Sequence, residues 1–292
     1  MNRMLRDKKA ILFFLAPALL MFVTFIIIPS CVSFYYSLTK WNGIGEKTFV
    51  GFQNYVNLFV NNKDGFPDTM KHAIWIALGS VFIQLPVSLF FSIVLARGVR
   101  GERFYVTTFF IPVVISTTVI AQLWAKIYHP TIGLLNTTLT SLGLESWTRI
   151  WLADPKTAMI AVIVPILWQY VGYHMLLMYT AIKTIPRDIY EAALIDGANR
   201  VQTAFRITIP LIKPILKVCV TFAIVGALKS FDLIFAMTQG GPMGKTDVPS
   251  TLMVETVFRS NQFGYGSSMA IIIIAMCFAS SLLIKKFFRV DE

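Results

Sequence analysis

The segment Ile185–Pro214, IPRDIYEAALIDGANRVQTAFRITIPLIKP, is polar and charged and lies between two long apolar stretches. Charged side chains are costly in hydrocarbon, so this segment belongs in water or against another protein. They include Arg187, Asp188, Glu191, Asp196, Arg200 and Arg206. The segment therefore predicts a loop through which a membrane protein contacts a partner or the solvent.

The composition is typical of a polytopic membrane protein. Hydrophobic residues make up 56% of the 292 positions and charged residues 14%, against roughly 45–50% and 25% in soluble domains. Several apolar runs approach the ~20 residues that a helix needs to cross a bilayer, and they lack the alternation of barrel strands. We expect one all-α transmembrane domain over residues 1–292. Its six spans are Ala10–Leu38, His72–Ala96, Phe104–Ile127, Thr157–Ile182, Ile215–Met237 and Ser267–Phe288.

The distribution of Lys and Arg predicts the orientation. Sixteen of the 26 basic residues fall at the two termini, after the second span and in the segment from Lys183 to Lys217, and these segments are short. By the positive-inside rule both termini and the loop 183–214 are cytoplasmic. The net charge of +11 is then a topology signal, and no contiguous basic, aromatic-studded face predicts nucleic-acid binding.

The motifs predict no cofactor on this chain. The stretch Gly240–Thr246, GGPMGKT, ends like a phosphate-binding loop, but Gln239 stands where the first Gly should be, and the loop is expected outside the cell. We interpret it as a turn after the fifth span. The three cysteines and three histidines are scattered, without the spacing of a metal site.

The polar loop has the pattern of a short helix. Pro186 suits a first helical position, and Asp188 and Glu191 would complement the helix dipole in the first turn. Gly197 either breaks this helix or allows a partner to approach closely, and a second helix is expected over Ala198–Ile207. An interfacial helix lying on the bilayer is the alternative, but its apolar face would be thin.

The loop also resembles a known motif. Glu191-Ala192-Ala193, Gly197 and ITIP at Ile207–Pro210 are similar to the EAA loop of the membrane subunits of binding-protein-dependent ABC importers, and EAALIDGA resembles the maltose and glycerol-phosphate branch. Further matches run along the chain in order: Trp41-Asn42, VGFQNY at Val50–Tyr55, GLLN at Gly133–Asn136, Trp151-Leu152, Trp168 and FDLIFAMTQGGP at Phe231–Pro242.

This resemblance implies the ABC importer type I permease fold in a bacterial inner or plasma membrane. It also implies four partner chains: a second permease, two ATPase subunits that bind ATP and Mg, and an extracytoplasmic solute-binding protein that delivers a sugar. The loop would couple the spans to the ATPases, with Glu191 for a charge contact, Ala192 and Ala193 for fit and Gly197 for close approach. Asp196, Ala198 and Arg200 complete the expected coupling residues.

Two groups of polar residues are candidates for the sugar path. The fourth span offers Trp168, Gln169, Tyr170, Tyr173 and His174, and Gln169 and Tyr173 share a helix face. The fifth offers Lys229 and Asp232, three residues apart. The aromatic residues could equally serve in helix packing, and Lys229 and Asp232 could form a structural ion pair.

Two other functional classes remain open at this stage. A secondary transporter or channel for a small polar solute would share the spans, but usually places more ionisable residues within them. A membrane-embedded enzyme would need a catalytic group of residues, and no such motif is found.

Overall fold

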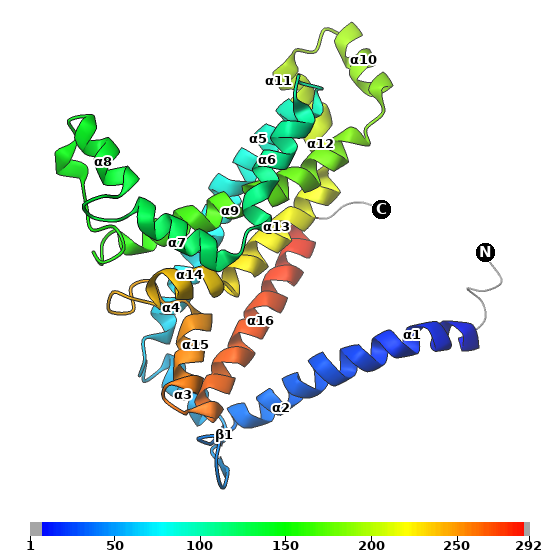
Figure 1. Cartoon of the computed structure of the whole chain (residues 1–292). Coiled ribbons are helices and arrows are strands. Elements are labelled where there is room, and N and C mark those ends of the chain that lie inside the picture. Colours follow the sequence, from blue (N-terminus) through cyan, green and yellow to red (C-terminus); the bar gives the residue numbers. More distant parts are fainter. Residues whose placement is uncertain (1–7, 289–292) are drawn as a thin grey trace. The chain divides into compact units, whose positions relative to one another are not determined.

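The computed structural model describes residues 8–288, with side chains from Leu12 onward, and its regular structure is almost entirely helical (Figure 1). The chain divides into two compact units. One holds the chain up to Phe66 together with Met253–Ile274, and the other holds Pro67–Leu252 and the chain from Ala275.

The first unit begins with a long apolar helical stretch. It is formed by α1 (Lys8–Phe22), the π-helical turn η2 (Val23–Ile27) and α2 (Ile28–Ser37). A two-stranded antiparallel ribbon, β1 (Thr39–Lys40) with β2 (Thr48–Phe49), and α3 (Gln53–Phe59) follow. The amide nitrogen of Asn54 fixes the ribbon by donating to the carbonyls of Ser37 (2.8 Å) and Thr39 (2.9 Å).

The second unit contains most of the helices. In chain order they are α4 (Phe66–Gly79), η3 (Ser80–Gln84), α5 (Leu85–Ala96), α6 (Glu102–Val114), α7 (Thr117–Ile127), α8 (Leu134–Ser141), η4 (Glu145–Trp147), α9 (Ala158–Lys183), α10 (Arg187–Ile195), α11 (Arg200–Thr203), η5 (Ala204–Thr208), α12 (Ile209–Leu211), α13 (Lys213–Leu228) and α14 (Asp232–Thr238). Two further helices, α15 (Pro249–Phe258) and α16 (Phe263–Phe287), each begin in one unit and end in the other.

Five helical stretches are long and apolar enough to cross a membrane, and they correspond to five of the six expected spans. They are Leu12–Ser37, Phe66–Ala96, Ala158–Lys183, Lys213–Thr238 and Phe263–Phe287. The sixth expected span, Phe104–Ile127, is α6 and α7, which meet at 97°. It is therefore a sharply bent helix pair, either a broken span or a re-entrant loop, and not the single helix that hydropathy predicted.

The break between α6 and α7 has a local cause. Pro112 lies near the end of α6 and lacks the N–H of a regular helix, and Ile115 and Ser116 adopt extended ψ angles of 140° and 133°. Ser116 is then the N-cap of α7, a position that serine favours. Ser116, Thr117 and Thr118 interrupt the apolar run only briefly, so the mean hydropathy of the whole stretch still resembles that of one span.

Small residues bring α5 and α6 close to α9. The hydroxyls of Ser88 and Ser92 on α5 donate to the α9 carbonyls of Val171 (2.9 Å) and Met175 (2.8 Å). On α6, the carbonyl of Phe109 approaches Gly172 of α9 so closely that a Cβ there would lie 1.9 Å from its oxygen. Such contacts through small residues and hydroxyls are typical of helices packed in lipid.

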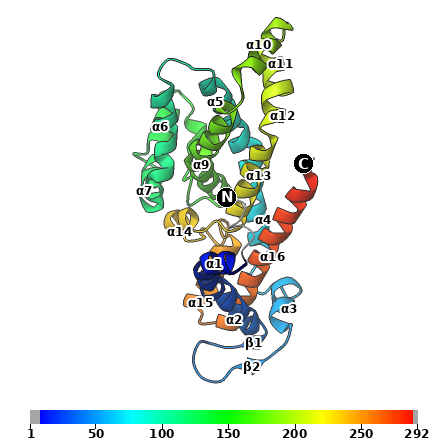
Figure 2. The same cartoon turned by 90° about the vertical axis from the view of Figure 1, so that its right-hand side faces the viewer.

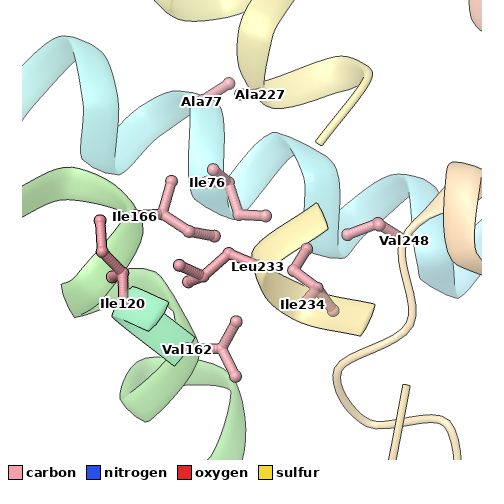
Figure 3. Packing of buried hydrophobic residues seen from close by; sticks show 9 residues of the cluster. All are labelled: Ile76, Ala77, Ile120, Val162, Ile166, Ala227, Leu233, Ile234 and Val248. Carbon is pink, nitrogen blue, oxygen red and sulfur yellow. The ribbon is translucent and has the colours of Figure 1, made fainter. Parts of the chain in front are cut away.

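A buried apolar cluster joins α4, α7, α9, α13 and α14 within the second unit (Figure 3). Its members are Ile76, Ala77, Ile120, Val162, Ile166, Ala227, Leu233, Ile234 and Val248. Figures 1 and 2 both show α10 and α11 beyond the same end of α5, α9 and α13. The polar loop of the sequence is thus carried at one end of a packed helix bundle.

Candidate functional site: a coupling loop and a polar cavity

The polar helix α10 (Arg187–Ile195) forms where the sequence predicted it. Pro186 is its N-cap, with φ −56° and ψ 141°, one position earlier than expected, because that extended ψ keeps proline out of the first helical turn. Asp188 lies in the first turn, where its carboxylate complements the helix dipole.

Gly197 ends α10 through a left-handed conformation. Its φ is +76°, and the N–H groups of Gly197 and Ala198 donate to the carbonyls of Leu194 (3.1 Å) and Ala193 (2.9 Å). This pair of bonds is the Schellman motif, which favours glycine at this position. A Cβ at Gly197 would meet nothing within 4 Å of this chain, so within the chain the backbone angle alone accounts for the glycine.

The outer face of α10 is largely exposed. Ala193 is buried, whereas Leu194 and Ile195 expose 75% and 86% of their surface. Glu191, Ala192 and Asp196 are also exposed, and Ala198 and Arg200 follow beyond the turn as half-buried and exposed residues. Two adjacent, almost fully exposed aliphatic side chains mark a surface suited to a partner.

The second helix of the loop starts later than expected. Asn199 caps α11 by accepting from the N–H groups of Val201 and Gln202, and Gln202 accepts from the Asn199 N–H in return. The helix therefore begins at Arg200 instead of Ala198, and its path continues through η5 and α12. Arg97, at the end of α5, contacts the start of α11 by donating to the Arg200 carbonyl at 3.2 Å.

A cavity of about 390 Å³ lies within the second unit and contains most of the expected sugar-path residues. Gln169, Tyr170 and Tyr173 line it from α9, and Lys229 and Asp232 line it from the fifth apolar stretch. Trp168 does not line it. That side chain packs against Trp124 of α7, with ring centroids 5.8 Å apart, which is the packing alternative, and its place in the sugar path stays a prediction.

The fifth apolar stretch is interrupted where it meets the cavity. Helix α13 ends at Leu228 and α14 begins at Asp232, with Phe231 at φ −144° and ψ −61° between them. Lys229 and Asp232 therefore sit at the ends of two helices and not on one face. Among the ion pairs of residues 8–288 none joins these two side chains, so the structural ion pair considered above is not formed.

Buried polar side chains complete the cavity lining. Gln84, Gln169 and His174 each expose 3% of their surface and all three line the cavity. Gln84 Nε2 and His174 Nδ1 have no hydrogen-bond partner among the described residues. Buried polar atoms of this kind normally have partners, so a ligand or water that offers acceptors fits this cavity.

Gln84 and Ser80 were missed in the sequence, although they contribute to the cavity from η3. The available signal was a polar amide in the middle of an apolar span, which usually faces the interior of a helix bundle. The stretch Gly240–Thr246 forms a turn between α14 and α15, as the sequence predicted, and Thr251 donates to Asp247 beside it at 2.8 Å.

A cavity with polar side chains between long apolar helices, combined with a projecting polar helix pair, is typical of a transport subunit. Residues 84–289 match the model of the family described as "Binding-protein-dependent transport system inner membrane component". The chain belongs to this family, and it is a multi-pass membrane permease of the ABC transporter class.

Relatives extend this assignment over the whole chain. A probable ABC transporter permease, YurN of Bacillus subtilis, is 38% identical over 96% of each chain. NgcF of Streptomyces coelicolor, a diacetylchitobiose uptake system permease, is 33% identical over 93% of this chain and 80% of its own length. A bacterial alginate ABC transporter, solved with a periplasmic protein that holds an alginate pentasaccharide, contains a chain of the same fold. Its TM-score is 0.83 at 22% identity, over 99% of this chain and 96% of that one.

Proposed function

We propose that this permease imports a sugar or short oligosaccharide through the cavity between α9 and the broken fifth stretch. The observation that carries the proposal is the lining: buried Gln84, Gln169 and His174 beside the phenols of Tyr170 and Tyr173. Amides and imidazole donate to and accept from hydroxyls, and aromatic rings face sugar rings, which is the chemistry of a site for a neutral polyhydroxylated ligand. The diacetylchitobiose relative supports this class of substrate.

The energy for import comes from other chains. In this proposal ATP and Mg²⁺ bind to two partner ATPase subunits, and this chain holds no cofactor. The ATPases engage α10 through Leu194 and Ile195, with Glu191, Ala192 and Asp196 around them on the exposed surface. Ala193, Gly197, Ala198 and Arg200 shape the helix end that is presented.

Movement of α10 would reach the cavity through packed elements. Tyr190 on α10 lies 3.3 Å from the hydroxyl of Thr208, which is buried in η5, and η5 leads through α12 into α13 and the cavity lining. A displacement of the loop by ATP-driven closure would thereby bias the spans between an inward-open and an outward-open arrangement.

The remaining partners and the orientation follow the same proposal. The chain pairs with a second permease, takes its sugar from an extracytoplasmic binding protein, and has both termini and the loop 183–214 in the cytoplasm of a bacterial cell. Three of the basic residues behind this orientation, Arg3, Arg6 and Arg289, lie outside the described residues.

Uptake of labelled saccharides by proteoliposomes containing the assembled transporter tests the proposal. We expect uptake only when ATP is supplied on the side of the membrane that carries the ATPase subunits. We also expect Tyr173→Leu and Gln169→Leu to lose uptake while the ATPase subunits remain bound. Uptake driven by an ion gradient without ATP would refute it. If Tyr173→Leu and Gln169→Leu import the same saccharides as the wild type, the location of the site is refuted.

A further inference from the structure

A second hollow, lined by basic side chains, lies beside the coupling loop of residues 183–214. Two adjoining cavities of about 510 and 610 Å³ share Arg97, Gly98, Tyr190 and Thr203 in their linings. We call them together the inner cleft. It is bounded by the end of α5, the end of α9 and the starts of α10 and α11.

The inner cleft is lined by more positive charge than the one acid at its edge, Glu102, can balance; a Cβ at Gly98 would lie 4.0 Å from that carboxylate. Arg97, Lys183, Arg187 and Arg200 line it, and among the described lining residues there is no Asp or Glu. Lys183 pairs with Glu102 at 2.8 Å. The other three are absent from the ion pairs of the described residues, and Arg97 gives one N–H to the Arg200 carbonyl, which carries no net charge.

Orientation alone does not explain this arrangement. The positive-inside rule predicts basic residues on one side of the membrane but not their convergence on one hollow. Arg100 and Arg206 lie in the same two loops, are exposed, and do not line the cleft. Arg97 lines both cavities, Arg187 lines the larger one and Arg200 the smaller one, so these three exposed arginines surround the inner cleft and need a separate reason.

We propose that the inner cleft binds the phosphate of a phosphate-bearing anion. One guanidinium fork satisfies a carboxylate, whereas the several oxygens of a phosphate accept from more than one fork. The hydroxyl of Thr203 and the phenol of Tyr190 add neutral partners at the same lining. Basic pockets between helices near the cytoplasmic surface are known to take anionic lipid headgroups, and soluble phosphate offers the same chemistry.

Occupancy of the cleft would affect the loop mechanically. A phosphate held by Arg97, Arg187 and Arg200 would link the end of α5 to both helices of the coupling loop, in addition to the bond that Arg97 already donates to the Arg200 carbonyl. The loop would then be held more firmly against the bundle. The inference concerns the loop and does not depend on which substrate crosses the membrane.

The test compares the purified full-length chain with two charge-matched double variants. R97Q/R187Q removes two lining guanidiniums, and R100Q/R206Q removes the same charge outside the cleft. One arm measures retention of phosphatidylglycerol against phosphatidylcholine by native mass spectrometry in neutral detergent. The other measures the shift in Tm caused by inorganic phosphate against chloride at equal ionic strength.

We expect R97Q/R187Q to retain phosphatidylglycerol about tenfold less well than the wild type, and R100Q/R206Q to match the wild type. If R97Q/R187Q differs from R100Q/R206Q both in lipid retention and in the Tm shift caused by phosphate, the ligand is a lipid headgroup. If the two variants differ only in the Tm shift caused by phosphate, the ligand is a soluble anion. R97K/R187K keeps the charge and should bind with intermediate strength, which separates loss of the site from misfolding. If the two double variants behave alike in both arms, or if R97Q/R187Q only releases a co-purifying ATPase subunit, the proposal is wrong.

Discussion

The carbonyl oxygen of Phe109 lies where the Cβ of any residue larger than glycine at position 172 would be, at 1.9 Å from its ideal position. Helices α6 and α9 thus touch backbone to backbone at this point. The contact fixes α6 just before the break that turns α7 away from it.

Gly172→Ala should consequently separate α6 from α9. A backbone carbonyl cannot rotate away as a side chain does, so we expect a loss of about 1–3 kcal/mol of stability or more. The measurement is thermal unfolding of the purified chain in detergent. Gly226→Ala in α13 is the matched control, because a Cβ there meets nothing within 4 Å; equal effects of the two substitutions would contradict the backbone contact.

Gly197 allows its two possible roles to be separated. Gly197→Ala should cost about 1–2 kcal/mol at the turn, because alanine tolerates the left-handed region poorly, whereas Gly197→Asn should largely restore the turn. ATP-driven uptake and subunit binding are the readouts. If asparagine restores uptake, the backbone angle is the reason for glycine. If both variants assemble and neither transports, the ATPase requires close approach at this position.

The exposed aliphatic pair on α10 should matter for coupling and not for folding. Leu194→Ser/Ile195→Ser changes side chains that are 75% and 86% exposed, so the Tm of the isolated chain should change by less than that of a core variant. Co-purification of the ATPase subunits should fall sharply. Ile132→Ser, at a position 80% exposed outside the loop, should leave subunit binding intact; loss of binding in that variant too would show a general effect of surface polarity.

Gln84 should show opposite effects on stability and on transport. Its amide nitrogen is buried without a partner, so Gln84→Leu removes an unsatisfied polar group and should raise stability by about 1–3 kcal/mol while saccharide uptake falls. Ser92→Ala provides the contrast, since it deletes a formed bond to Met175 and should lower stability by about 0.6 kcal/mol with uptake retained. A less stable Gln84→Leu chain would show that the amide has a structural partner.

Hydropathy predicted where the apolar stretches lie but not where they bend. The stretch Phe104–Ile127 is apolar on average despite its Ser and Thr residues, so hydropathy does not reveal that the chain turns by 97° near Ser116. Lys229 and Asp232, three residues apart, were expected within the fifth span as candidates for the sugar path or as a structural ion pair. The helix ends between them, and their common cavity is formed by tertiary packing that no local pattern specifies.

The coupling loop was predicted more completely than the cavity because its signals are local. Pro186, Gly197 and the Asn199–Gln202 pair set the start and stop of helices within a few residues of themselves. The cavity instead depends on which faces of η3 and α9 meet, so Gln84 was missed, and no local pattern indicated that Trp168 packs against Trp124.

The two caps that flank the turn at Gly197 have a consequence for association with a partner. The Schellman bonds and the reciprocal Asn199–Gln202 bonds hold the loop in shape using its own atoms. A partner that docks there meets a rigid surface and loses little conformational entropy in ordering it. Substitutions on its outer face should then act chiefly on the dissociation rate, with encounter rates almost unchanged.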